Sequence, residues 1–216
     1  MITGGDTKQR IIDVAERLFA QRGVEQTSTR DITAAAEVNV AAVNYHFGGR
    51  EGLLRAVLDR TIEPLNARRF ELLDLAVAEH GDPVPVEALL RAFVLPDLEC
   101  LVALGAERFE LARFIGRCYA QPSPEMEWVI RRQFSMLAER FYPMLQAAAP
   151  DVAPQELEFR MGLVVGVVVN LFETARPAVD GTLIGLADPR NALERLVRFL
   201  SPGIAAPSPL SSMATI

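Results

Sequence analysis

Apolar residues recur every three or four positions along most of this chain, and strict alternation of apolar and polar residues is nearly absent. Spacing of this kind places apolar side chains on one face of an α-helix, whereas alternation would indicate β-strands. Glycine, proline and short polar residues separate the periodic segments. The pattern therefore predicts an all-α protein of about nine helices.

The first three predicted helices are short, and their ends are marked by capping residues. Ser28 and Asp31 stand at the spacing of a capping box, and Asn39 can accept a hydrogen bond from an amide two or three residues later. Gly48 and Gly49 end the third helix. The expected bounds of the three helices are residues 6–23, 27–36 and 40–47.

Six further helices are expected after these. The fourth begins near Arg50 and bends near Pro64, and the fifth is interrupted at Pro96. The expected bounds are residues 50–78, 86–104, 106–120, 124–149, 154–176 and 188–200. We expect an N-terminal domain at residues 1–50 and a larger helical domain at residues 51–200. Residues 201–216 are rich in Ser, Pro and Ala, which predicts a disordered tail.

Charge and apolar runs limit the possible partners. Residues 1–60 carry equal numbers of basic and acidic side chains, so the net charge of −6 lies in the remainder of the chain. Nucleic-acid binding would then depend on a few placed side chains and not on a strongly basic surface. The longest apolar run, residues 161–172, is too short to span a bilayer, so no membrane partner is expected. Residues 1–8 lack the features of a secretory signal, which predicts a cytoplasmic protein.

The sequence offers little for catalysis. Its two histidines are His46 and His80, and its two cysteines, Cys100 and Cys118, have no metal-binding or redox spacing. We find neither a Gly-rich phosphate loop nor a G-x-S-x-G nucleophile motif. We therefore expect no enzyme activity, no metal and no cofactor.

The second and third helices form a candidate helix-turn-helix. Their shared apolar positions include Ile32, Val43 and Phe47. An ordinary corner between two helices would show the same core, so the exposed positions decide between the two readings. Val40, Ala41, Ala42 and Asn44 leave a slim helix without acidic side chains, which fits a DNA major groove. Asn44 would bind an adenine edge, or it is simply a surface amide.

Arg30 and Arg50 stand near the starts of the second and fourth helices. The helix dipole disfavours a cation there, and a nearby anion would reverse that effect. Phosphate contacts are therefore expected at both arginines. Other side chains suited to the DNA backbone are Thr27, Ser28, Thr29, Tyr45 and His46. Packing of Tyr45 and His46 beside Phe47 is the alternative for those two residues.

The stretch TSTRDITAAAEVNVAAVNYHFGGREGLL, with IIDVAERLFAQRG before it, resembles the DNA-binding domain of the TetR family of transcriptional regulators. The resemblance covers about the first 55 residues. It implies that Thr27 to Arg30 and Arg50 hold phosphates, that residues 40–44 face bases, and that Tyr45 and His46 lie at the backbone. Two positions depart from the family pattern, since Glu37 stands where Gly is common and Arg50 where Lys is usual.

The same resemblance implies that the larger domain forms a dimer and binds a ligand. Gly162 and Gly166 lie four residues apart on an apolar helix, which allows close approach of a second helix. Packing within one chain is the alternative. The residues expected at the dimer interface are Gly162, Val165, Gly166, Val169, Leu193, Leu196, Val197 and Leu200.

Large apolar side chains of the middle helices predict a ligand pocket, although aromatic residues at helical spacing also build ordinary cores. The expected lining is Phe109, Arg113, Phe114, Arg117, Trp128, Phe134, Tyr142 and Met161. Residues 113–162 are also similar to the subgroup of the family that responds to fatty acids or their thioesters. That similarity implies an acyl carboxylate paired with Arg113 or Arg117, unless these arginines are solvated on the helix exterior.

These observations predict a repressor that a small apolar effector releases from DNA. Its expected partners are a palindromic double-stranded operator, the effector and a second copy of the chain. An all-helical carrier or adaptor without DNA binding is the alternative. That reading accounts for the larger domain and leaves Arg30, Asn44 and Arg50, gathered around one turn, unexplained.

Overall fold

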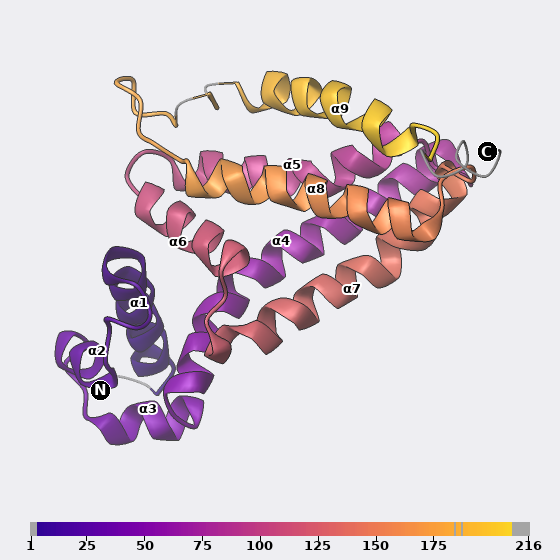
Figure 1. The fold of residues 1–216 in the computed structure, drawn as a ribbon. Helices are drawn as coiled ribbons and strands as arrows, with labels where there is room; N and C mark the ends of the chain where they lie inside the picture. Colours follow the sequence, from indigo (N-terminus) through magenta and orange to yellow (C-terminus); the bar gives the residue numbers. More distant parts are fainter. Residues whose placement is uncertain (1–3, 184, 187, 209–216) are drawn as a thin grey trace, which may run out of the picture.

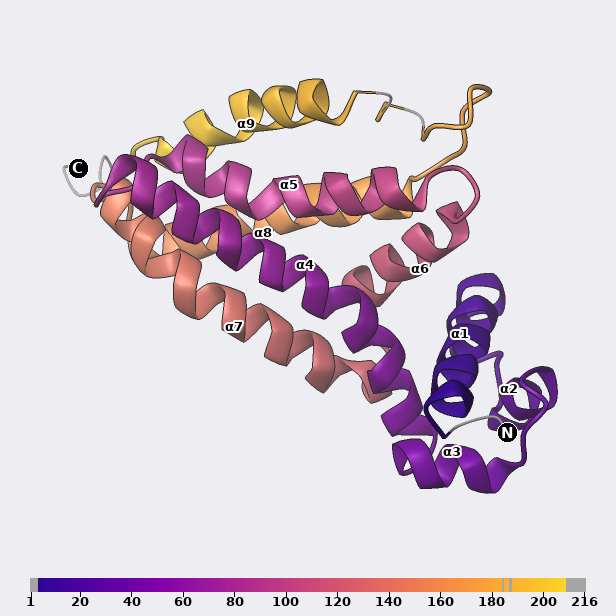
Figure 2. The ribbon, with the colours of Figure 1, turned by 180° about the vertical axis from the view of Figure 1, so that it is seen from behind.

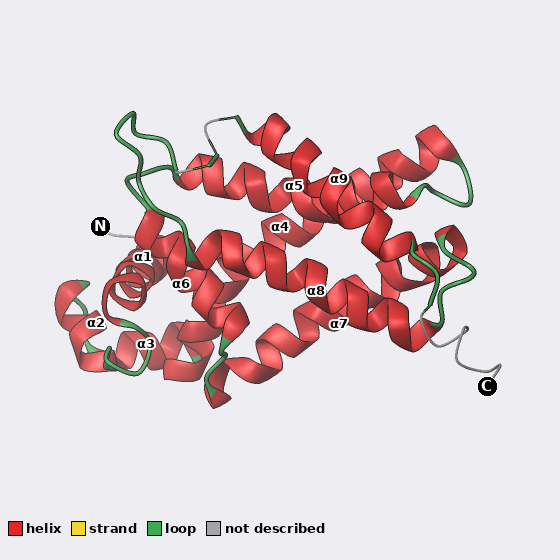
Figure 3. Cartoon of the chain, turned by 45° about the horizontal axis from the view of Figure 1, so that its top comes forward, coloured by secondary structure: helices red, strands yellow, loops and turns green. Residues whose placement is uncertain are grey.

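The computed structural model describes residues 4–183, 185–186 and 188–208, and its regular structure there is helical (Figures 1 and 3). The predicted all-α fold and the number of helices are confirmed for the described residues. The helices are α1 (Gly4–Arg22), α2 (Thr29–Ala35), α3 (Val40–Phe47), α4 (Arg50–His80), α5 (Val86–Leu104), α6 (Phe109–Ala120), α7 (Pro124–Ala148), α8 (Pro154–Glu173) and α9 (Pro189–Ala205).

Helices α1, α2 and α3 form a small head at one end of the molecule (Figure 1). The predicted caps are present, because Ser28 and Asp31 make a reciprocal capping box and the Asn39 side chain accepts from the Ala42 amide at 2.9 Å. Ile32 of α2 and Val43 of α3 are both fully buried and belong to the same apolar core as the buried residues of α1. The local sequence therefore fixes the start of each short helix, and apolar burial fixes their packing.

Helix α4 connects the head to the rest of the molecule, which we call the body (Figure 2). Its first turn packs so closely on the end of α3 that a Cβ atom at Gly52 would lie 1.8 Å from the Phe47 carbonyl oxygen. Only glycine fits such an approach. Pro64 lies inside α4 without ending the helix.

The body is built around α5, which packs against α4 and α9, while α6 packs against α8 (Figures 1 and 2). Gly116 permits the close approach of α6 to α8, because a Cβ atom there would lie 2.7 Å from the Glu173 nitrogen. The predicted interruption of the fifth helix at Pro96 is wrong, because α5 continues through this residue to Leu104. The helix continues because the residues around Pro96 are buried in the core, and their packing offsets the lost amide.

The predicted disordered tail is wrong for residues 201–208. Helix α9 continues past Leu200 to Ala205, and Ser201, Ile204 and Ser208 are buried. Arg160 of α8 holds this segment by donating to the carbonyl oxygens of Ile204 and Ala206, at 2.9 and 2.5 Å. Residues 209–216 lie outside the described residues. The Ser, Pro and Ala composition missed this anchor because it comes from a distant helix.

None of the described helices combines the length and the apolar composition that crossing a bilayer requires.

Candidate nucleic-acid interface and effector groove

The outer face of α3 is the most distinctive surface of the head. Val40, Ala41, Asn44 and Tyr45 are exposed, and Tyr45 keeps 85% of its surface accessible. Val43 is fully buried on the opposite side. This division follows from the helical period, which places residues 40, 41, 44 and 45 on one face. Ala42 and His46 are half-buried at its edges, and the His46 and Tyr45 rings meet edge to face at 5.0 Å between centroids.

The turn before α3 contains an unusual backbone conformation. Glu37 has φ of 53°, and it is the one residue other than glycine with positive φ in the described part of the chain. The Val38 amide donates to the Thr33 carbonyl oxygen at 3.0 Å, which closes the turn. Glu37 therefore adopts the left-handed conformation that glycine, the common residue at this position in the family the sequence resembles, adopts without strain.

The start of α2 offers two further groups at the surface. Arg30 is exposed in the first turn and Thr29 is half-buried. The Ser28 hydroxyl accepts from the Asp31 amide at 3.1 Å, and the Asp31 carboxylate accepts from the Ser28 amide at 2.8 Å. Hydrogen bonds from the Ser28 hydroxyl and amide keep the pKa of Asp31 below its ordinary value. Ser28 is exposed, but its hydroxyl is already part of the cap.

Thr27 and Arg50 were predicted to hold phosphates, and the structure gives both an internal role. Thr27 is 1% exposed, and its hydroxyl donates to the Gly23 carbonyl oxygen at 2.8 Å. The half-buried Arg50 guanidinium donates to the carbonyl oxygens of Thr27 and Val24, at 2.5 and 2.6 Å. Arg50 thus ties the start of α4 to the loop between α1 and α2, because the carbonyls of this loop have no helical partners.

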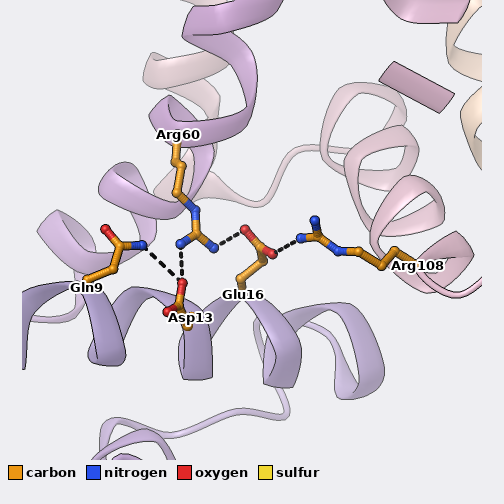
Figure 4. Close-up of polar contacts among 5 residues, drawn as sticks. All are labelled: Gln9, Asp13, Glu16, Arg60 and Arg108. Carbon is orange, nitrogen blue, oxygen red and sulfur yellow. Dashed lines mark hydrogen bonds and ion pairs between the residues drawn. The ribbon is translucent and has the colours of Figure 1, made fainter. Parts of the chain in front are cut away.

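A charged network that was not predicted from the sequence joins the head to the body (Figure 4). Glu16 of α1 accepts from Arg60 of α4 and from Arg108, which lies just before α6. Arg60 also pairs with Asp13 at 2.5 Å, and the Gln9 amide donates to Asp13 at 3.0 Å. Glu16 is 8% exposed. The position of Glu16 on the apolar face of the first predicted helix could have indicated a buried acid that needs basic partners.

Burial raises the pKa of Asp13, but the hydrogen bonds from Arg60 and Gln9 outweigh it, so this pKa lies below its ordinary value. The carboxylate therefore stays charged at neutral pH, and the contact with Arg60 is maintained.

An open groove of about 490 Å³ runs between α7 and α8 and is our candidate effector site. Its floor contains the buried residues Phe93, Leu137 and Phe141. Of the predicted lining residues, Phe134, Tyr142 and Met161 are placed in this groove. A volume of this size suits a small ligand with a mainly apolar body.

The other predicted pocket residues lie elsewhere. Phe114 is buried against Phe19 of α1, with ring centroids 6.2 Å apart, and Arg117 donates to the Ala20 carbonyl oxygen at 3.3 Å. Trp128 is 42% exposed under the Arg55 guanidinium. Phe109 and Arg113 do not line the groove either; Arg113 is exposed near Glu110. Phe114 and Arg117 of α6 therefore face α1 and Arg113 faces solvent, while Phe109 is partly buried against the core.

The predicted dimer residues separate into two groups. Gly162 and Gly166 of α8 are exposed, and a Cβ atom at either would meet nothing within 4 Å. Val165, Val169 and Leu196 are half-buried. Leu193, Val197 and Leu200 are buried within the chain, on the side of α9 that packs on α5, so they belong to the internal core. Phe159, Leu163 and Phe199 of the same two helices, which are not among the residues predicted at the interface, are exposed apolar residues.

Both cysteines are free thiols, Cys100 half-buried and Cys118 buried. Burial raises the pKa of the Cys100 thiol to about 11 and that of Cys118 to about 12. Neither thiol is therefore ready to react at neutral pH. No group of three or more His, Cys, Asp or Glu side chains there is placed to hold a metal ion.

The sequence is similar to those of known bacterial transcriptional regulators. The chain is 32% identical over 113 residues to the transcriptional regulator AcrR of Shigella flexneri, which covers 52% of this chain and 50% of AcrR. It is 35% identical over 108 residues to the transcriptional repressor Rv3405c of Mycobacterium tuberculosis, covering 48% of this chain and 57% of that protein. The chain thus spans about half the length of these curated relatives.

Solved structures share the fold over nearly the whole chain. A bacterial regulatory protein of the tetR family from Rhodococcus RHA1 superposes with a TM-score of 0.66 at 20% identity, over 94% of this chain and 98% of that one. PfmR of Thermus thermophilus, a TetR family transcriptional regulator, gives a TM-score of 0.61 at 21% identity, over 88% of this chain and 97% of that one. At such identities the likeness concerns the fold alone.

Family profiles match both parts of the molecule. The profile described as bacterial regulatory proteins, tetR family, matches residues 11–57, which contain the helix-turn-helix. The profile described as tetracyclin repressor-like, C-terminal domain, matches residues 91–203, which is more than half of the chain. With the exposed α3 face and the helical body already described, the chain belongs to the TetR family of bacterial transcriptional regulators, a family of DNA-binding proteins and not of enzymes.

Proposed function

We propose that this protein is a homodimeric repressor that binds a palindromic operator and is released by a small apolar effector. The outer face of α3 carries the proposal. Val40, Ala41 and Asn44 project from a helix with no acidic residue in its first turn, so the helix can enter a major groove. An all-helical carrier without DNA binding would have no need of this face.

The assignment of DNA contacts follows exposure. Asn44 offers both a donor and an acceptor to an adenine edge, and Ala41 or Val40 can touch a thymine methyl group. Arg30, at the exposed start of α2, contacts phosphate, and Tyr45 reaches the neighbouring backbone. Thr27 and Arg50 support this surface from inside.

Release follows from the way the body holds the head. Helix α7 forms one wall of the groove and packs on α4, which in turn packs on α1 and α3 of the head. Movement of α4 would change the separation of the two heads in the dimer, and with it their fit to successive major grooves. The effector must bind the non-fitting state more tightly, since otherwise the equilibrium does not move.

A gel shift with DNA from upstream of the gene tests the proposal. We expect a shifted complex on a partly palindromic site, weakened at the higher of two salt concentrations because phosphate contacts release counterions. Absence of any salt-sensitive complex on that DNA would contradict the repressor and favour the carrier.

Asn44→Ala tests whether the Asn44 side chain contacts a base. We expect a loss of base preference at one position in each half-site, worth about 1 to 3 kcal/mol. The measurement is the affinity of wild type and variant for operators altered at single positions. An equal loss on every operator would show that Asn44 contacts only the DNA backbone.

A further inference from the structure

A small cavity of about 20 Å³ adjoins the groove between α7 and α8, and Phe93, Phe134, Leu137 and Val165 line both spaces. We call it the polar cavity because five polar side chains are among its lining residues, Asn66, Arg69, Asp97, Tyr119 and Gln133. A volume of this size holds about one oxygen atom of a ligand. The molecule in the groove can therefore place one polar atom among buried side chains.

The polar side chains around the cavity form a directed chain of hydrogen bonds. Arg69 donates through Nη2 to Asp97 at 2.6 Å and through Nη1 to the Asn66 carbonyl oxygen at 2.7 Å. The Asn66 amide then donates to Gln133 Oε1 at 2.8 Å. All four side chains are buried.

The direction of this chain is fixed by chemistry. A carboxylate can only accept and a guanidinium can only donate, so Arg69 must face the oxygen of Asn66. The nitrogen of Asn66 must then face the oxygen of Gln133, which assigns both amide orientations. The Gln133 amide nitrogen is left at the end of the chain as a donor, and it has no hydrogen-bond partner among the described residues.

Tyr119 adds a second donor at the same cavity. It lines the space, its ring packs edge to face on Phe134 at 5.6 Å, and its hydroxyl has no hydrogen-bond partner in the described part of the chain. Burial raises the pKa of this hydroxyl, so it keeps its proton at neutral pH. The cavity is therefore lined by two residues whose donors have no hydrogen-bond partner among the described residues, the buried Gln133 and the half-buried Tyr119.

Charge restricts that acceptor further. Arg69 is 4% exposed and Asp97 is 1% exposed, so the guanidinium is already neutralised by a buried carboxylate. A ligand carboxylate in the cavity would add an unbalanced negative charge near the buried Asp97, because Arg69 is the one basic residue among the described residues that line the cavity and it already pairs with Asp97. A neutral carbonyl oxygen accepts two hydrogen bonds without this penalty.

We propose that the effector is an uncharged, mainly apolar molecule whose inner end carries a carbonyl oxygen, bound by Gln133 and Tyr119. The inference rests on the proposed function in taking this groove as the effector site. It separates ketones, esters and lactones, which can place a neutral oxygen in the cavity, from free fatty acids. A fatty-acid carboxylate would have to pair with Arg131 of the groove, because the predicted Arg113 and Arg117 line neither space.

Isothermal titration of the full chain with two probes tests the proposal. The probes are methyl nonyl ketone and undecanoate, which have the same carbon count and differ in the charged group. We expect the ketone to bind at least tenfold more tightly at neutral pH. Equal or tighter binding of undecanoate, or no binding of the ketone, would overturn the inference.

Tyr119→Phe removes only the hydroxyl and keeps the ring on Phe134. We expect it to weaken ketone binding by about threefold to tenfold, the effect of one lost hydrogen bond. Ser123→Ala is the matched control, because it also removes one hydroxyl without a partner, makes no side-chain cap on α7, lines neither the groove nor the polar cavity, and should keep the wild-type affinity. An unchanged ketone affinity in Tyr119→Phe, or an equal loss in both variants, would overturn the role of this hydroxyl.

Gln133→Glu replaces the terminal donor with an acceptor of the same size and still accepts from Asn66. We expect it to abolish the preference for the ketone while thermal unfolding stays cooperative. A ketone affinity unchanged from wild type would contradict the proposal. None of these titrations contains DNA, so failure here leaves the gel-shift result standing, and failure of the gel shift leaves the ligand class standing.

Discussion

Arg30 and Arg50 show how two similar residues near helix starts come to differ in role. Arg30 is exposed, whereas the half-buried Arg50 guanidinium lies against two loop carbonyls and 5.9 Å from the Phe19 ring centroid. The helix dipole alone would favour an anion beside both arginines. At Arg50 the loop carbonyl oxygens, which carry partial negative charge, take the place of an anion. At Arg30 we expect a DNA phosphate to be the anion.

A pair of substitutions separates these roles. Arg50→Met should lower the free energy of unfolding by roughly 1 to 3 kcal/mol, because two carbonyls lose charged donors. Arg30→Met should leave stability within about 0.5 kcal/mol of wild type but weaken binding to all operators, as expected for a phosphate contact. Urea unfolding and gel shifts measure the two effects. Normal stability in Arg50→Met would refute its internal role.

Glu37 carries backbone strain that glycine would relieve. At φ of 53° a residue with a Cβ atom strains the folded state by about 1 to 2 kcal/mol. Glycine removes this strain, but it also gives the unfolded chain more conformational freedom, which cancels part of the gain in stability. Glu37→Gly should therefore raise the free energy of unfolding by about 0.5 to 1 kcal/mol. Glu37→Ala controls for the lost charge, because it keeps the Cβ atom. A gain in Glu37→Ala equal to that in Glu37→Gly would contradict the explanation.

At the scale of helices, local signals and long-range packing contribute differently. Ser28, Asp31 and Asn39 cap α2 and α3 as predicted, because a cap needs only neighbours three residues away. The end of α9 depends on Arg160, more than 40 residues earlier, and no local signal contains that contact. Sequence periodicity therefore located the helices better than their ends.

The contact between α1, α4 and the residue before α6 is the element-scale link between head and body. Glu16 is nearly buried, while the side chains of Arg60 and Arg108 are 28% and 55% exposed. The shared carboxylate should therefore couple more strongly to Arg60, which is less screened by solvent and also holds Asp13.

Double-mutant cycles test this order. We expect a coupling of about 1 to 2 kcal/mol between Glu16→Gln and Arg60→Gln, and below about 1 kcal/mol between Glu16→Gln and Arg108→Gln. Urea unfolding of the single and double variants gives both values. Since the pKa of Asp13 is lowered in the folded state, its contribution should persist at neutral pH and be lost only as pH falls through that lowered value. A larger coupling to Arg108 would reverse the assignment.

For the whole molecule, the sequence predicted the head better than the groove. The α3 face could be predicted because one short helix with a regular period supplies it. The polar cavity combines Asn66 and Arg69 of α4, Asp97 of α5, Tyr119 of α6 and Gln133 of α7. These residues are scattered over nearly 70 positions and become neighbours only when the helices pack. Their spacing along the chain carries no signal of that meeting.

The surface that we propose for dimerisation is apolar and exposed. Phe159, Leu163 and Phe199 keep 62%, 56% and 75% of their surfaces accessible, and open space lies over Gly162 and Gly166. A second copy of the same helices would cover these side chains across a two-fold axis. Such a dimer also sets the distance between the two heads.

Leu163→Arg should therefore give a monomer with unchanged helical circular dichroism and at least tenfold weaker operator binding, because each head alone contacts one half-site. Leu75→Arg is the matched control, since Leu75 on α4 is equally exposed, at 56%, but lies outside the proposed surface. Sedimentation equilibrium measures the mass and gel shifts the affinity. A dimer that survives Leu163→Arg, or dissociates equally in Leu75→Arg, would place the interface elsewhere on the molecule.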